Sequence, residues 1–130
     1  MKNFPQEYLD LLQNETKAYL FLATTMPDGS PQVTPIWFNA NDDYILINTN
    51  EGRTKDRNMK ARPQVALVIQ DPKTPYRYIQ IRGEIAEYTT QGADEHINQL
   101  SLKYDNEPWK YREGQKRIIF KIKPTHIDRH

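Results

Sequence analysis

Basic side chains concentrate in one short segment of this otherwise nearly charge-balanced sequence. Residues 53–62 contain five of the 18 lysines and arginines, namely Arg53, Lys55, Arg57, Lys60 and Arg62. The segment follows the alternating apolar run 44–49, turns at Gly52 and continues into a stretch of helical composition. Backbone N–H groups at a helix N-terminus are unpaired, and the helix dipole favours an anion beside them. From these residues alone, a phosphate-binding turn and an ordinary solvated basic loop are equally good interpretations.

A second unusual segment is the stretch 30–38, which contains Pro31 and Pro35 and then Trp37. Because proline cannot donate a ladder hydrogen bond, such a strand lies at a sheet edge or is interrupted. An interrupted strand leaves backbone groups free, and the tryptophan offers a flat apolar surface, so the segment could hold a planar heterocycle. The competing interpretation is an edge strand whose tryptophan belongs to the core.

Other familiar kinds of site find little support. The three histidines lack metal-ligand spacing and the chain has no cysteine, so we predict no bound metal, disulfide or thiolate nucleophile. No glycine-rich phosphate loop, dinucleotide fingerprint or nucleophile elbow occurs, and the catalytic residues are unassigned. Aromatic and basic residues at 76–78 and 109–111 could stack on nucleic-acid bases. A net charge of +1, however, gives no general attraction to a polyanion.

The length of 130 residues fits one domain, residues 1–130, with a single core. The first residues contain no apolar segment of a secretory signal, and no apolar run is long enough to cross a bilayer. We therefore expect a soluble cytoplasmic protein.

Hydrophobic periodicity predicts a mainly β protein with peripheral helices. Helices are expected at 5–15, from the basic segment to Pro63, and at 91–105. Strands are expected at 17–25, 31–39, 44–49, 65–69, 76–88 and 116–123, the last closed by Pro124. Gly83, inside the longest strand, predicts a bulge or a close backbone approach. Six antiparallel strands joined mostly by short turns favour a small closed β-barrel.

Several short motifs, taken in order, resemble the flavin- or deazaflavin-binding split β-barrel superfamily related to pyridoxamine 5′-phosphate oxidase. The motifs are Ala23-Thr24-Thr25 before Pro27-Asp28-Gly29, the run Pro31–Phe38, Gly52-Arg53-x-Lys55-x-x-Asn58, Arg62-Pro63-Gln64-Val65, and Tyr76-Arg77-Tyr78-Ile79 leading to Gly83. Their order and spacing match over roughly residues 15–90. The resemblance is closest to the short branch of this class that uses the deazaflavin coenzyme F420. It implies a six-stranded antiparallel split barrel of the FMN-binding type.

The resemblance also implies a cofactor site. In the F420-dependent branch the second strand lies along the cofactor ring, and the basic segment binds the phosphate side. Ring contacts are implied for Val33, Thr34, Pro35, Ile36 and Trp37. The implied phosphate-side residues are Thr49, Asn50, Gly52, Arg53, Lys55 and Asn58. The family is homodimeric with its cofactor between subunits, which makes residues 76–80 candidate contributors from a partner chain.

The function implied by the resemblance is an oxidoreductase that uses coenzyme F420, or alternatively FMN, to transfer a hydride to or from a small unsaturated organic molecule. True pyridoxamine 5′-phosphate oxidases carry a C-terminal segment with tryptophan and arginine for the substrate phosphate. Residues 126–130 offer no equivalent, which argues against that particular reaction. Two alternatives stay open: a non-catalytic flavin-binding carrier or sensor, and a small barrel that binds nucleic acid.

Overall fold

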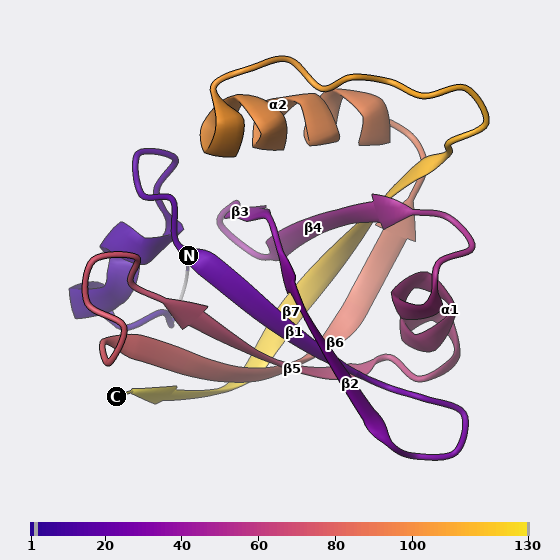
Figure 1. The fold of residues 1–130 in the computed structure, drawn as a ribbon. Coiled ribbons are helices and arrows are strands. Elements are labelled where there is room, and N and C mark those ends of the chain that lie inside the picture. The colour runs from indigo at the N-terminus through magenta and orange to yellow at the C-terminus, as the bar shows by residue number, and fades with distance from the viewer. Residues whose placement is uncertain (2, 130) are drawn as a thin grey trace.

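The computed structural model describes residues 1 and 3–129, which form one curled antiparallel β-sheet with helices at its margins (Figure 1). The strands are β1 (Tyr19–Thr25), β2 (Pro31–Ile36), β3 (Phe38–Ala40), β4 (Ile45–Asn50), β5 (Gln64–Gln70), β6 (Tyr78–Thr89) and β7 (Arg117–Arg129). The helical segments are the 3₁₀ helix η1 (Gln6–Leu12) and the α-helices α1 (Thr54–Ala61) and α2 (Ala93–Asp105). No helix among the described residues is long and apolar enough to cross a membrane.

The strand predicted at 31–39 is in fact two strands, which corrects the predicted count from six to seven. The sheet order is β2-β1-β5-β6-β7-β4-β3, so β2 and β3 lie at opposite edges although only Trp37 separates them in the chain. The sheet must therefore curl until its two edges approach each other, and we call residues 36–38 the seam. Pro35 is tolerated because β2 pairs only with β1. The mainly β, antiparallel split-barrel architecture is confirmed.

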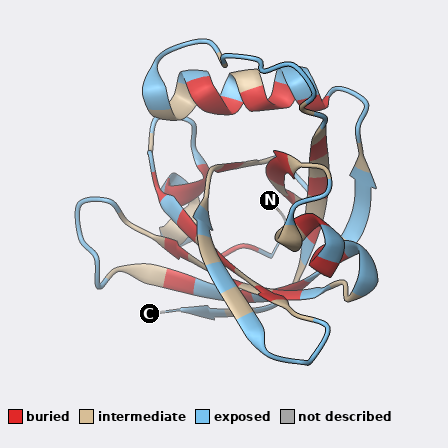
Figure 2. Cartoon of the chain, turned by 45° about the vertical axis from the view of Figure 1, so that its right-hand side comes forward, coloured by how far each residue is buried: buried red, intermediate tan, exposed pale blue. Residues whose placement is uncertain are grey.

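The core lies inside the curl and follows the period-two alternation of the strands. Leu20 and Leu22 of β1 share the inner face with Ile79 and Ile81 of β6, on either side of β5, and all four side chains are at most 1% exposed. Burial of each such side chain contributes roughly 1.5–3 kcal/mol. Figure 2 shows the buried residues along the strands and on α2, which packs over β4 and β7. The helix predicted over residues 91–105 is confirmed as α2, and its buried residues form a packing face.

Both ends of the chain differ from the sequence prediction. The N-terminal helix expected over 5–15 is the shorter 3₁₀ helix η1. The last strand does not end at Pro124 but continues to Arg129, so that prediction was wrong. Pro124 is accommodated because it lies opposite Gly83, where the pairing of β6 with β7 shifts register.

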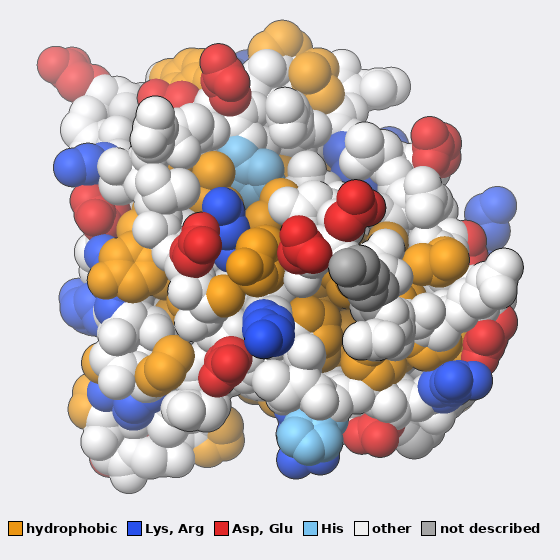
Figure 3. All heavy atoms as spheres, turned by 180° about the vertical axis from the view of Figure 1, so that it is seen from behind, with side chains coloured by type: hydrophobic (Ala, Val, Ile, Leu, Met, Phe, Trp, Pro, Cys, Tyr) orange, Lys and Arg blue, Asp and Glu red, His pale blue; other side chains and the backbone are white. Residues whose placement is uncertain are grey.

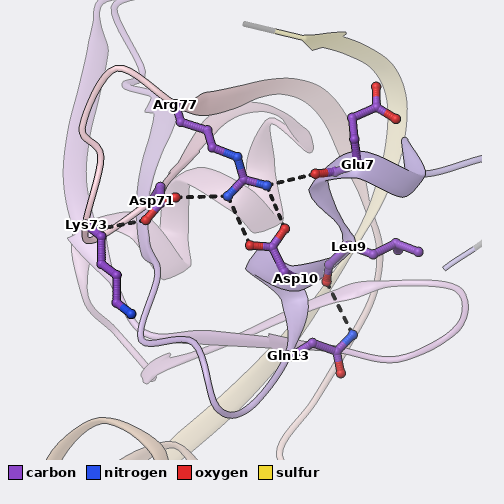
Figure 4. A network of polar contacts seen from close by, with 7 residues as sticks. All are labelled: Glu7, Leu9, Asp10, Gln13, Asp71, Lys73 and Arg77. Carbon is purple, nitrogen blue, oxygen red and sulfur yellow. Dashed lines mark hydrogen bonds and ion pairs between the residues drawn. The ribbon is translucent and has the colours of Figure 1, made fainter.

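Arg77 fixes η1 to the loop between β5 and β6 (Figure 4). Its two terminal nitrogens donate to the Asp10 carboxylate at 2.7 and 3.0 Å, and also to Asp71 and to the Glu7 backbone carbonyl. This arginine, which the sequence offered as a nucleic-acid contact, is therefore engaged within its own chain. On the face shown in Figure 3, acidic and basic side chains are interspersed, so no field of one sign covers it.

We expect Gly83→Ala to lower the free energy of unfolding by about 1–3 kcal/mol. A Cβ at Gly83 would lie 2.7 Å from the backbone oxygen of Lys123 and 3.1 Å from Ile122 Cγ2, so the paired strand would have to move. Both sequence predictions for this glycine, a bulge and a close approach, are confirmed. Urea unfolding of Gly83→Ala beside Glu84→Ala, an exposed neighbour on β6, checks the effect. Equal stability of the two variants would contradict it.

Candidate functional site

A cavity of about 610 Å³ opens beside the seam, within the size range of small-molecule sites. It is bounded by the seam, the end of β4, the start of α1, the inner side of α2 and the loop 106–116. The lining residues are Pro35, Ile36, Trp37, Asn48, Thr49, Arg53, Lys55, Ile97, Ser101, Asp105, Glu107, Pro108, Trp109, Lys110, Arg112, Gln115 and Arg117. The two segments singled out in the sequence, the proline-containing strand and the basic helix start, thus meet at one cavity.

Six of the eleven predicted cofactor residues lie in the cavity wall. They are Pro35, Ile36, Trp37, Thr49, Arg53 and Lys55. The other five, Val33, Thr34, Asn50, Gly52 and Asn58, do not line it. Val33 is 65% exposed and alternates to the outer face of β2. Asn58 is buried, where its Nδ2 donates to Thr24 Oγ1 at 3.0 Å and its Oδ1 accepts from Arg62 at 3.0 Å.

The backbone N–H groups of Gly52 and Arg53, in the turn before α1, are hydrogen-bonded within the chain. Gly52 has φ +93°, and the Arg53 N–H donates to the Asn50 carbonyl at 3.2 Å, so glycine here serves a tight turn. The Gly52 N–H donates to Asp56 Oδ2 at 2.8 Å, which places a carboxylate of the chain at the helix start. The Asn50 side chain accepts the Lys116 N–H at 3.0 Å. Side chains rather than these amides therefore supply the positive charge that faces the cavity.

The cavity wall carries five cations without a carboxylate partner among the described residues: Lys110 and Arg112 on the loop 106–116, and a group of three whose charges act on one another. Arg53, Lys55 and Arg117 form no ion pair with any residue that the structure describes. Burial, and then the nearby charges of Arg53 and Arg117, lower the pKa of Lys55 below its ordinary value. Burial and then Arg53 likewise lower the pKa of Arg117. An anion bound among these groups would offset their mutual repulsion and their partial loss of solvent.

Two tryptophan side chains form another part of the wall. The Trp37 ring stacks on Tyr104 with centroids 5.4 Å apart and an interplanar angle of 2°, and Trp109 meets Trp37 edge-on at 6.2 Å. Tyr104 is anchored by a 2.7 Å hydrogen bond that its hydroxyl donates to the Ala18 carbonyl. Of the two sequence interpretations, the edge strand is confirmed for β2, whereas Trp37 is half-buried and lines the cavity. A contact of Trp37 with a planar heterocycle stays a prediction.

Sequence reasoning missed the contribution of Asn48, the loop 106–116 and Arg117. The loop has no periodicity that marks it, and Arg117 is one of several basic residues at 116–123. Two buried atoms of this region, Trp109 Nε1 and Gln115 Oε1, lack a hydrogen-bond partner among the described residues. Such orphaned groups in a native protein call for an explanation, and a bound ligand with one acceptor and one donor would supply it.

The protein is thus a curled split β-barrel with aromatic side chains and cations without carboxylate partners beside its seam. The chain belongs to the pyridoxamine 5′-phosphate oxidase family, with which residues 4–130 match. A solved structure described as an F420 reductase is 33% identical, has a TM-score of 0.84, and is matched over 96% of this chain and 98% of that chain.

More distant structures show the same fold. The conserved hypothetical protein Rv2991 from Mycobacterium tuberculosis is 20% identical with a TM-score of 0.70, over 95% of this chain and 82% of that one. The heme storage protein HutZ from Vibrio cholerae is 17% identical with a TM-score of 0.68, over 95% and 93%. No curated protein matches the chain significantly. The fold is therefore shared by proteins described in different functional terms.

Proposed function

We propose that the protein is an oxidoreductase that binds coenzyme F420, or FMN, in the seam cavity and transfers a hydride to or from a small unsaturated organic molecule. The observation that carries this proposal is the group of three unpaired cations, Arg53, Lys55 and Arg117, in the wall of a cavity that Trp37 and Trp109 also line. Membership of the family and the 33% identity to an F420 reductase over nearly the whole chain support it.

Each part of the wall has a role in this proposal. Arg53 and Lys55 bind the phosphate through charge-assisted hydrogen bonds. Pro35, Ile36 and Trp37 flank the ring, and the orphaned atoms of Trp109 and Gln115 provide a donor and an acceptor for its polar edge. The cofactor supplies the hydride chemistry, whereas the chain binds and orients it and limits access of water. Thr49 lines the same cavity.

The five predicted residues outside the wall have two kinds of role. Asn50, Gly52 and Asn58 hold the turn and the helix that carry Arg53 and Lys55, as their hydrogen bonds indicate. Val33 and Thr34 continue the strand along which the ring would lie. We propose that a second copy of the chain brings this strand into contact with the cofactor.

An apolar outer face supports a homodimer. Ala23 lies between Val33 and Ala66 in register, and Phe21 lies between Pro35 and Val68, so all six side chains project from the same side of β2, β1 and β5. Paired residues of antiparallel strands share a face, and this face is the one opposite the core. Because Pro35 also lines the cavity, a partner seated here would adjoin the cofactor.

Absorbance-detected sedimentation of the purified protein with FMN or F420 tests cofactor and dimer together. We expect the cofactor band to sediment with a species of twice the mass of the 15.4 kDa chain. If neither cofactor co-sediments, the proposal is wrong. A cofactor that sediments with the monomer contradicts the dimer alone.

The second candidate is a non-catalytic carrier or sensor, because proteins of this fold include one described as a heme storage protein. The oxidoreductase and the carrier or sensor would hold the same cofactor in the same cavity. Turnover separates them: an enzyme should oxidise reduced cofactor in the presence of unsaturated acceptors faster than free cofactor reacts. A carrier should slow that reaction by excluding the acceptor.

A further inference from the structure

Arg117 is held by a chain of hydrogen bonds that crosses four elements. Asn48 on β4 accepts from Arg117 Nε through its Oδ1 at 2.8 Å. The amide nitrogen of Asn48 donates to the Ala93 carbonyl at 2.9 Å and to His96 Nδ1 at 3.1 Å. His96 in turn donates from Nε2 to Asn39 Oδ1 on β3 at 2.8 Å. Asn48 is 4% exposed and His96 6%, so the two bonds from the Asn48 amide nitrogen are buried, whereas the bonds at Arg117 and Asn39 are partly buried.

The chain of hydrogen bonds allows only one orientation of the Asn48 amide. Its two nitrogen-side neighbours, a backbone carbonyl and the unprotonated His96 Nδ1, are both acceptors. A flipped amide would place oxygen against both acceptors and its NH₂ against the Arg117 guanidinium. The amide oxygen must therefore face Arg117, and His96 must be neutral with its proton on Nε2.

This arrangement leaves the outer side of the guanidinium available. Nε is bound to Asn48, and the guanidinium carbon lies 5.1 Å from the centroid of the Trp109 ring, which limits its rotation. Neither terminal nitrogen of Arg117 has a hydrogen-bond partner in the described part of the chain. The free pair of NH₂ groups has the fork geometry that binds two oxygens of one phosphate. Arg53 and Lys55 line the same cavity.

We propose that Arg117 is a phosphate-binding residue of the seam cavity and that Asn48 and His96 are the positioning residues that aim its guanidinium. The proposal deepens the function proposed above and rests on it for the identity of the ligand. The chemistry recognised is a phosphate or diphosphate group, bound by a fixed arginine fork beside two further cations.

The test compares ligands with and without phosphate, of which FMN and riboflavin differ in the phosphate alone. Wild-type protein, Arg117→Gln, Asn48→Ala and Asn48→Asp are titrated with FMN and riboflavin, with F420 and its phosphate-free deazariboflavin core, and with inorganic pyrophosphate. We expect all three variants to lose about tenfold or more in affinity for the phosphate-bearing ligands. Affinity for the phosphate-free rings should stay within about twofold, which a merely structural effect would not produce.

Asn48→Asp provides a second test of position 48 if Asn48→Ala does not fold. An aspartate still accepts from Arg117 Nε but neutralises its charge, so phosphate affinity should fall. The second aspartate oxygen replaces the NH₂ group that donates to the Ala93 carbonyl and to His96 Nδ1, so an unfolding curve is recorded for this variant as well. Arg117→Lys should recover part of the loss, since charge returns without the fork. Lys116→Gln is the matched control: its side chain is 68% exposed and faces Glu51, and affinity should not change.

Two results would overturn the inference. One is an unchanged affinity of Arg117→Gln for pyrophosphate and FMN, and the other is an equal loss for phosphate-bearing and phosphate-free ligands in folded Asn48 variants. Failure of the proposed function is distinguishable: wild-type protein would then bind pyrophosphate in an Arg117-dependent manner and neither cofactor.

Discussion

Replacing both Arg53 and Lys55 with alanine should weaken binding of F420 or FMN by about 100-fold to 10,000-fold, since each charge-assisted phosphate bond contributes about 1.5–3 kcal/mol. Both side chains line the cavity, and neither has a carboxylate partner among the described residues. Their charge is therefore available to a ligand rather than used in folding. Fluorescence or absorbance titration at constant ionic strength measures the change.

A control of equal charge separates the site from the general field of the protein. Lys73→Ala with Arg82→Ala also removes two positive charges, but both positions are exposed and lie outside the cavity wall. Cofactor affinity of this control should stay within about twofold of the parent. If the two double variants lose affinity equally, or if Arg53→Ala/Lys55→Ala binds normally, the phosphate assignment is wrong.

The same double variant should not unfold more easily than the parent protein. Burial and neighbouring cations already lower the pKa of Lys55, which means that its charge is held at a cost in the unliganded fold. Removing such groups from a functional site commonly leaves stability unchanged or raises it. A thermal unfolding curve recorded beside each titration distinguishes lost binding from lost structure.

The strands and their buried faces were predictable because they depend on local alternation. Gly83 was recognised from its position alone, since a glycine within a strand marks a bulge or a close approach. The division at Trp37 was not predictable in this way. It depends on β2 and β3 having different partners, β1 and β4, and the identity of a strand's partner is a property of the whole sheet. The end of the last strand was wrongly predicted at Pro124 for the same reason. The register shift that accommodates this proline depends on its partner Gly83 on β6.

The candidate site shows the same limit: features within one segment were predictable from the sequence, whereas contacts between distant segments were not. Spacing within one segment identified Arg53 and Lys55, but side-chain direction removed Val33 and Asn58 from the cavity wall. The residues that sequence reasoning missed interact over long separations. The hydrogen bond from Arg117 to Asn48 joins residues 69 positions apart, and that from Asn48 to His96 spans 48. No motif of adjacent residues records such contacts.

His96 should make the stability of the protein depend on pH between about 4 and 6.5. Burial, and then the charge of Arg117, lower the pKa of His96 from its ordinary 6.5 to about 4. The unfolded chain therefore takes up a proton over this interval while the native protein does not, so the free energy of unfolding falls as pH falls. The contribution is complete above pH 6.5 and about 3 kcal/mol of it is lost by pH 4.

Urea unfolding of the parent and of His96→Gln across this interval measures the effect. Glutamine does not titrate, so the variant should lose stability less steeply as pH falls, and the difference between the two proteins should shrink toward pH 4. His126→Gln, at an exposed position on β7, serves as the control and should retain the slope of the parent. Because protonated His96 can no longer accept from Asn48, phosphate affinity should decline over the lower part of the same interval. A variant at position 96 that keeps the full slope would show that another group is responsible.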